Sequence, residues 1–154
     1  MSIHDTRPGG ARARRRRGAA ALEFAIACPL LFLIFLGMVE IGRAMMAAGA
    51  LAAAARSGAR AASVTGGSYS SATGAAATVL SDADLPNSGA TTVTVNGVVV
   101  TDDESFREAA VPGATVGVKV ALPYSSVSWL PGGGVLFLSA NQSIAAVCEM
   151  TKEG

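Results

Sequence analysis

The feature that most constrains this chain is an uncharged apolar run near its N-terminus, Phe24–Val39, which is sixteen residues long. As an α-helix it measures about 24 Å, or about 31 Å when counted from Ala19. The hydrocarbon core of a bilayer is about 30 Å thick. Pro29 removes a backbone hydrogen bond, which membrane helices tolerate where neighbouring groups satisfy the freed carbonyl. The sequence therefore predicts a transmembrane helix over residues 19–42.

Positive charge is concentrated before this run. Arginines at positions 7, 12 and 14–17 supply six of the twelve basic residues of the chain, and Asp5 is the one acid before Gly18. By the positive-inside rule, residues 1–18 form a basic cytoplasmic leader of a single-pass inner-membrane protein, with a periplasmic C-terminal domain. Nucleic-acid binding competes as an explanation. No aromatic residue accompanies the arginines, so no nucleic-acid partner is expected.

A cleaved secretory signal is the alternative explanation of the same region. Ala48-Gly49-Ala50 satisfies the A-x-A cleavage pattern, but such a pattern is almost unavoidable in an alanine-rich stretch. The apolar run is also long for a signal peptide, and Glu40 and Arg43 lie before the candidate cut. A retained membrane helix is therefore favoured.

Glu23 is the unusual residue of the apolar region, because an ionised carboxylate in lipid is costly unless it is protonated or paired. Glu23 is the fifth residue after Gly18 and is followed by Phe24. This spacing is similar to the processing site of type IV prepilins. The GAAALEF start, EIGR at Glu40–Arg43 and the ARSGARAA segment resemble, more narrowly, the TadE-like family, over about Arg17–Ala62.

That resemblance implies a minor pseudopilin of the tight-adherence (Flp) pilus system. A prepilin peptidase would cut between Gly18 and Ala19, where glycine is expected to give an extended, unhindered backbone. Glu23 would then pair with the N-terminal amine of a neighbouring subunit. The implied partners are the peptidase, other pilins or pseudopilins through the N-terminal helix, the inner-membrane assembly machinery and membrane lipid. Incorporation of the protein into a cell-surface pilus is one implied location. A protonated or snorkelling carboxylate at the interface explains a glutamate near the helix end, but not its spacing from Gly18.

Glu40 and Arg43 are three residues apart, and this spacing places them side by side on a helix. They are predicted as an exposed membrane-interface pair, which stabilises a helix by only a few tenths of a kcal/mol. A role in subunit docking ranks second.

Beyond Arg43 the chain stays rich in alanine, so one helix is predicted from Ala19 to about Ser63, with residues 43–64 as an extension beyond the membrane. Residues 65–154 are predicted to form a small α+β domain with a mostly antiparallel sheet, like that of pilins. Its first expected parts are a link over Thr65–Gly74, a short helix at 75–83 and a hairpin turning at Asn96-Gly97. A loop or helical turn at 102–108 and a strand at 114–122 should follow. The last expected parts are a loop carrying Trp129 among Pro123, Pro131 and the glycines at 132–134, and one or two final strands within 135–150.

No catalytic set, cofactor site or metal site is expected. The single histidine, His4, lies in the leader, and Cys28 and Cys148 lie too far apart in depth to pair. An acidic run, Asp102–Glu104, is better explained as a solvated turn than as a cation site. A structural pilin-like role is therefore favoured over two alternatives: an uncleaved, membrane-anchored envelope binding protein and a type II secretion pseudopilin.

Overall fold

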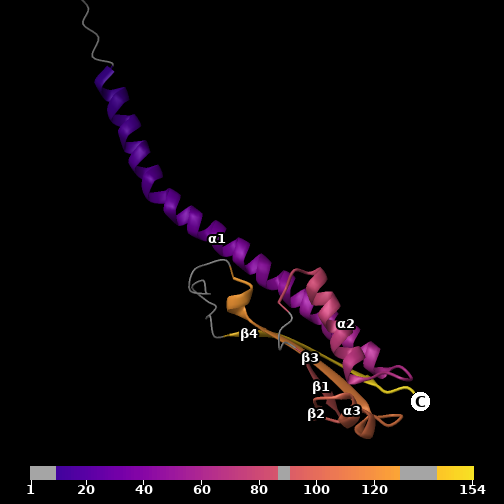
Figure 1. Cartoon of the computed structure of the whole chain (residues 1–154). Coiled ribbons are helices and arrows are strands. Elements are labelled where there is room, and N and C mark those ends of the chain that lie inside the picture. The colour runs from indigo at the N-terminus through magenta and orange to yellow at the C-terminus, as the bar shows by residue number, and fades with distance from the viewer. Residues whose placement is uncertain (1–9, 87–90, 129–141) are drawn as a thin grey trace, which may run out of the picture. The chain divides into compact units, whose positions relative to one another are not determined.

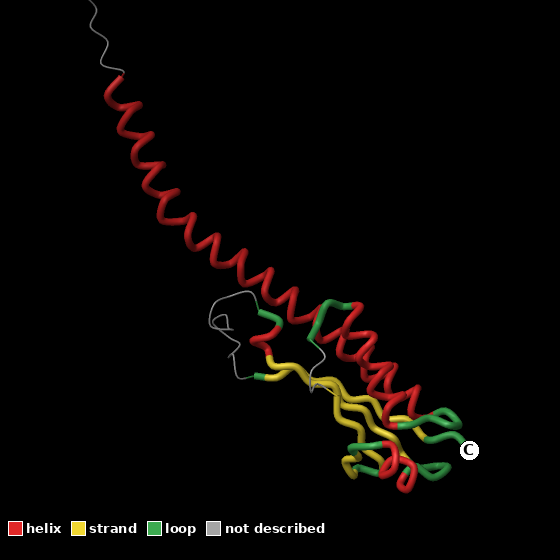
Figure 2. The backbone as a smooth tube through the Cα atoms, in the orientation of Figure 1, coloured by secondary structure: helices red, strands yellow, loops and turns green. Residues whose placement is uncertain are grey.

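The computed structural model describes residues 10–86, 91–128 and 142–154, drawn in colour in Figure 1. By its internal contacts the chain divides into two units, Met1–Val39 and Glu40–Gly154. The elements are a long helix, a second helix, a four-stranded antiparallel sheet and a short third helix (Figure 2). The predicted α+β fold, a long N-terminal helix followed by a small antiparallel sheet, is confirmed.

The long helix α1 spans Gly10–Ser63 and contains Pro29. Its end agrees with the prediction, because Gly66 and Gly67 follow and Gly66 adopts a φ of 79°. Its start lies nine residues before Ala19. Gly18 therefore lies inside a helix, and the extended backbone expected there is wrong: one glycine weakens a helix without ending it.

The second helix, α2, spans Tyr69–Asp82 and begins earlier than predicted. Ser68 caps it: its hydroxyl accepts a hydrogen bond from the backbone N–H of Ser71 at 3.1 Å, and the Ser71 hydroxyl accepts one from the N–H of Ser68 at 2.9 Å. This reciprocal capping satisfies two N–H groups that a helix start leaves unpaired. The predicted link therefore ends at Ser68, not at Gly74.

The sheet has the strand order β2-β1-β3-β4. Strands β1 (Thr91–Val95) and β2 (Val98–Val100) form the predicted hairpin. Asn96 and Gly97 have φ values of 49° and 81°, the positive values that a type I′ turn requires. The acidic stretch after β2 is a helix, α3 (Asp103–Ala109), capped by Asp102.

The two remaining strands complete the sheet. The predicted strand at 114–122 is β3 (Thr115–Pro123), followed by a 3-10 turn, Tyr124–Ser126. β4 (Ser143–Thr151) pairs with all nine residues of β3. The predicted strand at 135–140 and the loop with Trp129, Pro131 and glycines 132–134 lie outside the described residues.

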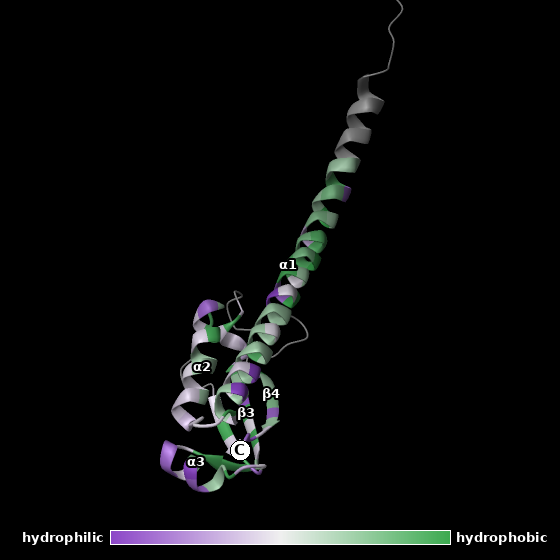
Figure 3. Cartoon of the chain, turned by 90° about the vertical axis from the view of Figure 1, so that its right-hand side faces the viewer, coloured by the Kyte–Doolittle hydropathy of each residue, from purple (hydrophilic) through white to green (hydrophobic). Residues whose placement is uncertain are grey.

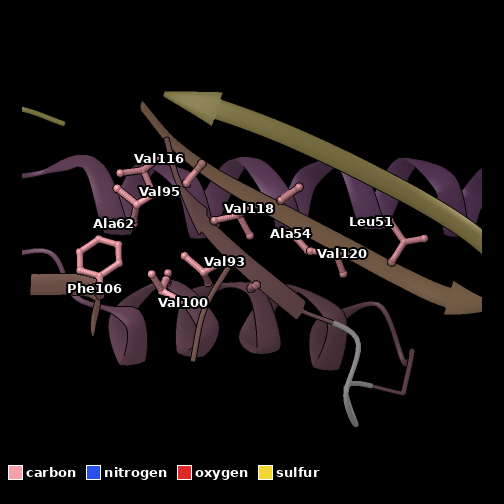
Figure 4. Close-up of a cluster of buried hydrophobic side chains, with 14 of the residues drawn as sticks. Leu51, Ala54, Ala62, Val93, Val95, Val100, Phe106, Val116, Val118 and Val120 are labelled. Carbon is pink, nitrogen blue, oxygen red and sulfur yellow. The ribbon is translucent and has the colours of Figure 1, made fainter. Parts of the chain in front are cut away.

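One face of the sheet packs against the last part of α1 and against α2 (Figure 4). Close approach occurs at Gly58 of α1, where a Cβ atom would lie 2.9 Å from the carbonyl oxygen of Ala72 and 3.1 Å from Val118 Cγ1. The core is built of small and β-branched side chains, with Phe106 at one end. Its members include Leu51, Ala54, Ala62, Val93, Val95, Val100, Val116, Val118 and Val120.

The end of α1 is held by the C-terminal residues. The Lys152 ammonium donates to the carbonyl oxygens of Ala62 at 2.9 Å and Val64 at 2.8 Å, and the Glu153 N–H donates to the Ser63 carbonyl at 2.8 Å. Helix ends leave carbonyls without intrahelical donors, so these bonds act as a C-cap supplied from the far end of the chain.

Candidate functional site on the N-terminal helix

Apart from Glu23, the described side chains of the first unit are apolar on all sides of the helix (Figure 3). Its large side chains are mostly well exposed, from Phe24 at 69 % and Ile26 at 72 % to Met38 at 67 %. None of the residues Ala20–Val39 is buried within the protein. A helix that is apolar all round normally lies in a core or in a membrane. This one is a candidate membrane span.

The residues of the predicted processing site all lie on this helix. Gly18 and Ala19 are within α1, and Glu23 and Phe24 follow one turn later with exposed side chains. Ala19 and Glu23 are four residues apart and are therefore neighbours on one helical face. Their assignment as a processing site stays a prediction.

Glu40 is almost fully buried, with 2 % of its surface exposed. The Tyr124 hydroxyl donates a hydrogen bond of 2.8 Å to Glu40 Oε1. Tyr124 lies 84 positions further along the chain and is 1 % exposed. Within the protein, the expectation of an exposed Glu40 is therefore wrong, because the turn after β3 covers the carboxylate.

Arg43 also contacts this turn. Its Nε–H donates to the Val127 carbonyl oxygen at 3.2 Å. Glu40 and Arg43 are thus both engaged by residues 124–127. Their predicted role as a membrane-interface pair remains a prediction, although their position at the start of the second unit is compatible with it.

The environment of Tyr124 changes its acidity. Burial raises the pKa of its hydroxyl to about 12, and the hydrogen bond to Glu40 and the negative charge of Glu40 act in the same direction. All three effects favour the neutral phenol, which is the form that can donate to the carboxylate. The geometry and the acidity therefore agree that Tyr124 is the donor.

Sequence reasoning missed Tyr124 and Val127. The available signal was the requirement that a buried carboxylate have a hydrogen-bond donor. Tyr124 is one of two tyrosines in the chain, so it was a candidate donor. The choice between them depends on long-range packing, which neither periodicity nor spacing reveals.

Elsewhere in the part of the chain that the structure describes, no group of three or more His, Cys, Asp or Glu residues is placed to hold a metal ion. Cys28 and Cys148 are both free. Asp102, before α3, and Asp103, at its start, both accept hydrogen bonds from backbone N–H groups. Asp102 accepts from the Ser105 N–H at 2.7 Å and Asp103 from the Ser70 N–H at 2.8 Å, and these bonds lower the pKa of both carboxyls.

Comparison with protein-family models relates part of the chain to a known family. A family model described as TadE-like protein matches residues 18–60. Those residues include Gly18, Glu23, Glu40 and Arg43, so the resemblance drawn from the sequence is confirmed over this segment. No curated protein and no solved structure matches the chain.

Proposed function

We propose, from the TadE-like segment at residues 18–60, that this chain is a membrane-anchored structural subunit of tight-adherence pilus assembly, of the minor pseudopilin class. The observation that carries the proposal is the change in α1 at Glu40. Over Ala20–Val39 the helix is apolar apart from Glu23 and is largely exposed, and from Glu40 onward one side of the helix packs against the sheet. One helix thus provides both an anchor and a stem.

The length of the exposed part supports a membrane span. Ala20–Val39 contains twenty residues, about 30 Å of helix, which matches the hydrocarbon core of a bilayer. The arginines at 12 and 14–17 support a cytoplasmic N-terminus and a periplasmic sheet domain. In this arrangement Glu40 and Arg43 leave the bilayer together with the domain that binds them.

The second part of the proposal is processing by a prepilin peptidase between Gly18 and Ala19. Because Gly18 lies within α1, the peptidase must first unwind the helix there. A glycine inside a helix costs about 1 kcal/mol relative to alanine, so unwinding is easier at Gly18 than at its alanine neighbours. Cleavage removes the arginine block and creates an amine at Ala19.

The third part concerns Glu23. Its side chain is exposed on a helix that we place in lipid, where an ionised carboxylate needs a partner. The new amine of a neighbouring subunit is a cation of the right charge at the right depth. Pairing the two brings subunits together through their N-terminal helices, in register with one another.

The test is the N-terminus of the mature protein, measured by mass spectrometry in a strain with its own peptidase. We expect a chain that starts at Ala19. Gly18→Glu should block the cut, whereas Gly10→Glu, which adds the same charge away from the site, should leave it intact. A chain that still starts at Met1, a chain that starts at Leu51, or normal processing of Gly18→Glu would contradict the proposal.

Assembly provides the second measurement. If Glu23 pairs between subunits, Glu23→Gln should be processed normally and should fail to join the assembled structure. An uncleaved anchor for an envelope binding domain predicts no cut and no effect of Glu23→Gln. A type II secretion pseudopilin predicts the cut, but assembly with a different machine, so co-purification with tight-adherence components separates the two.

A further inference from the structure

The charged residues of α1 at the start of the second unit lie against the turn that follows β3. Glu40 is 2 % exposed, and the Tyr124 hydroxyl that covers it donates a hydrogen bond of 2.8 Å to Oε1. Arg43 is half-buried and donates from Nε to the Val127 carbonyl oxygen at 3.2 Å. The polarity of the opposite, free side of α1 at this level is therefore set by other residues.

That free side is apolar. Ile41 is 54 % exposed, Met45 71 % and Met46 77 %. Met38, Ile41 and Met45 follow one another at spacings of three and four residues, so they lie on one face of the helix. The exposed apolar surface of α1 thus continues beyond Glu40 without interruption.

Polar side chains return to this side only further along the helix. Ala53 is exposed, and Arg56 is the first exposed charged residue of α1 after Glu23. The free side therefore changes from large apolar to charged side chains between Met46 and Arg56, well beyond the buried Glu40. Clusters of exposed large apolar side chains mark surfaces that contact other proteins or membranes.

A groove between α1 and the start of β4 enlarges the apolar surface. Ile41, Met45 and Ile144 are among the residues that line it, and its volume is about 450 Å³. Sites that take small ligands have volumes of about 300–1,000 Å³, so the groove has room for part of a lipid molecule.

The height of these residues along α1 matches the headgroup layer of a bilayer. A bilayer is about 40–45 Å thick with its headgroups and about 30 Å thick without them, so each headgroup layer measures about 5–8 Å. With Ala20–Val39 in the hydrocarbon core, the backbone of Met45 and Met46 lies about 9–11 Å beyond it. Long side chains on a helix lean toward its N-terminus, which here is toward the bilayer. The two thioethers therefore reach back into the headgroup layer.

We propose that the headgroup layer covers α1 as far as Met46, so that Ile41, Met45 and Met46 contact phospholipid and the turn Tyr124–Ser126 lies against the bilayer. The partner is a lipid surface because the apolar surface is continuous with that of the span. The inference rests on the proposed membrane span and adds a lipid-binding surface at the start of the second unit. The bond from Tyr124 then keeps the Glu40 carboxylate out of contact with lipid, where an unpaired charge is costly.

The test measures the surroundings of single spin labels by their collisions with oxygen, which concentrates in lipid, and with a nickel chelate, which stays in water. The full chain is placed in vesicles of phosphatidylethanolamine and phosphatidylglycerol, with the chelate on both sides of the bilayer and with Cys28 and Cys148 replaced by alanine. Labels are attached one at a time at exposed positions of α1. These are Phe32→Cys, Met45→Cys, Met46→Cys and Ala53→Cys.

The Phe32 label lies within the span and gives the value for lipid, and the Ala53 label is the aqueous control on the same helix. At Met45 and Met46 the ratio of oxygen to nickel collisions should be at least about twofold higher than at Ala53 and lower than at Phe32.

A second measurement keeps a label on the turn after β3, at the exposed Ser125→Cys, and changes the methionines. Its ratio should also exceed that of the Ala53 label. Adding Met45→Glu and Met46→Glu together should lower the Ser125 ratio to the aqueous value, because carboxylates do not enter the bilayer without cost. Ala53→Glu is the matched control and should leave the Ser125 ratio unchanged. All three substituted side chains are exposed, so the fold does not depend on them.

Each contrary outcome has a separate meaning. Labels at Met45 and Met46 that meet nickel as often as the Ala53 label, with the Phe32 label in lipid, overturn the inference and leave the membrane anchor standing. Few collisions with either reagent at Met45 and Met46 reveal a protein cover, such as a second copy, and overturn lipid as the partner. An unchanged Ser125 ratio in the double glutamate variant overturns the contact of the turn with the bilayer. A Phe32 label in water contradicts the membrane span of the proposed function itself.

Discussion

Gly58 offers the sharpest test of how α1 packs against the rest of the domain. Replacing a helical glycine with alanine normally stabilises a helix by about 0.5–1 kcal/mol. At Gly58 the added Cβ would lie 2.9 Å from the Ala72 carbonyl oxygen, 3.1 Å from Val118 Cγ1 and 3.4 Å from Ala76 Cβ. The nearest of these atoms belongs to the backbone of α2 and cannot move by a rotamer change.

Overpacking of this kind costs about 1–3 kcal/mol, which exceeds the gain in helix propensity. Gly58→Ala should therefore lower the free energy of unfolding by up to about 2 kcal/mol. Gly49 is the matched control, because it lies on the same helix and a Cβ there meets nothing within 4 Å. Gly49→Ala should raise stability by about 0.5–1 kcal/mol, so the two variants should differ by about 1–3 kcal/mol.

The assay is equilibrium unfolding of the full chain in detergent micelles, followed through the sheet signal in circular dichroism. Gly58→Ser should lose at least as much stability as Gly58→Ala, since it adds a further atom at the same place. A Gly58→Ala chain as stable as Gly49→Ala would refute the close approach of α1, α2 and β3.

Two further predictions concern the ends of the same contact. Lys152→Met removes the ammonium that caps α1 and that lies 5.6 Å from the centre of the Phe106 ring. The free energy of unfolding should therefore fall by about 1–2 kcal/mol in the same unfolding assay. Lys119→Met, at an exposed position, is the control and should change it by less than about 0.5 kcal/mol. Stability should also fall as the pH rises from about 10, the unfolded pKa of a tyrosine, to about 12, the folded pKa of Tyr124, because the folded state holds this proton more tightly than the unfolded state. Tyr124→Phe should lose this part of the pH dependence and Tyr69→Phe should keep it; equal slopes for the two variants would count against the buried phenol.

The parts of the fold that were predicted correctly rest on local signals. Asn96-Gly97 predicts the hairpin, because both residues of its turn must adopt a positive φ and few other residue pairs do so readily. The alanine-rich stretch before Thr65 predicts where α1 ends, and the alternation of apolar and other residues predicts β3. Each of these signals is confined to a few neighbouring residues, so no tertiary information was needed.

The errors also have local causes. The start of α2 was missed because its capping box uses Ser71 where the common pattern has Glu or Gln, so Ser68–Gly74 resembles a loop. Gly18 does not interrupt α1, because a single glycine weakens a helix without ending it. The burial of Glu40 depends on Tyr124, which is 84 positions away, and nothing within one helical turn of Glu40 indicates it.

The C-terminal residues that cap α1 have a mechanical consequence. Glu40 is bonded to Tyr124 at one end of the contact, and Ala62, Ser63 and Val64 are bonded to Lys152 and Glu153 at the other. A force along the axis of α1 acts on a contact that hydrogen bonds hold at both ends, so the helix and the sheet cannot separate progressively from one end. Such a force must slide the buried alanines and Gly58 of α1 past the sheet and break both sets of hydrogen bonds at the same time. The domain is therefore built to resist tension along its stem, and it should yield far more easily to a force that lifts the sheet away from the helix.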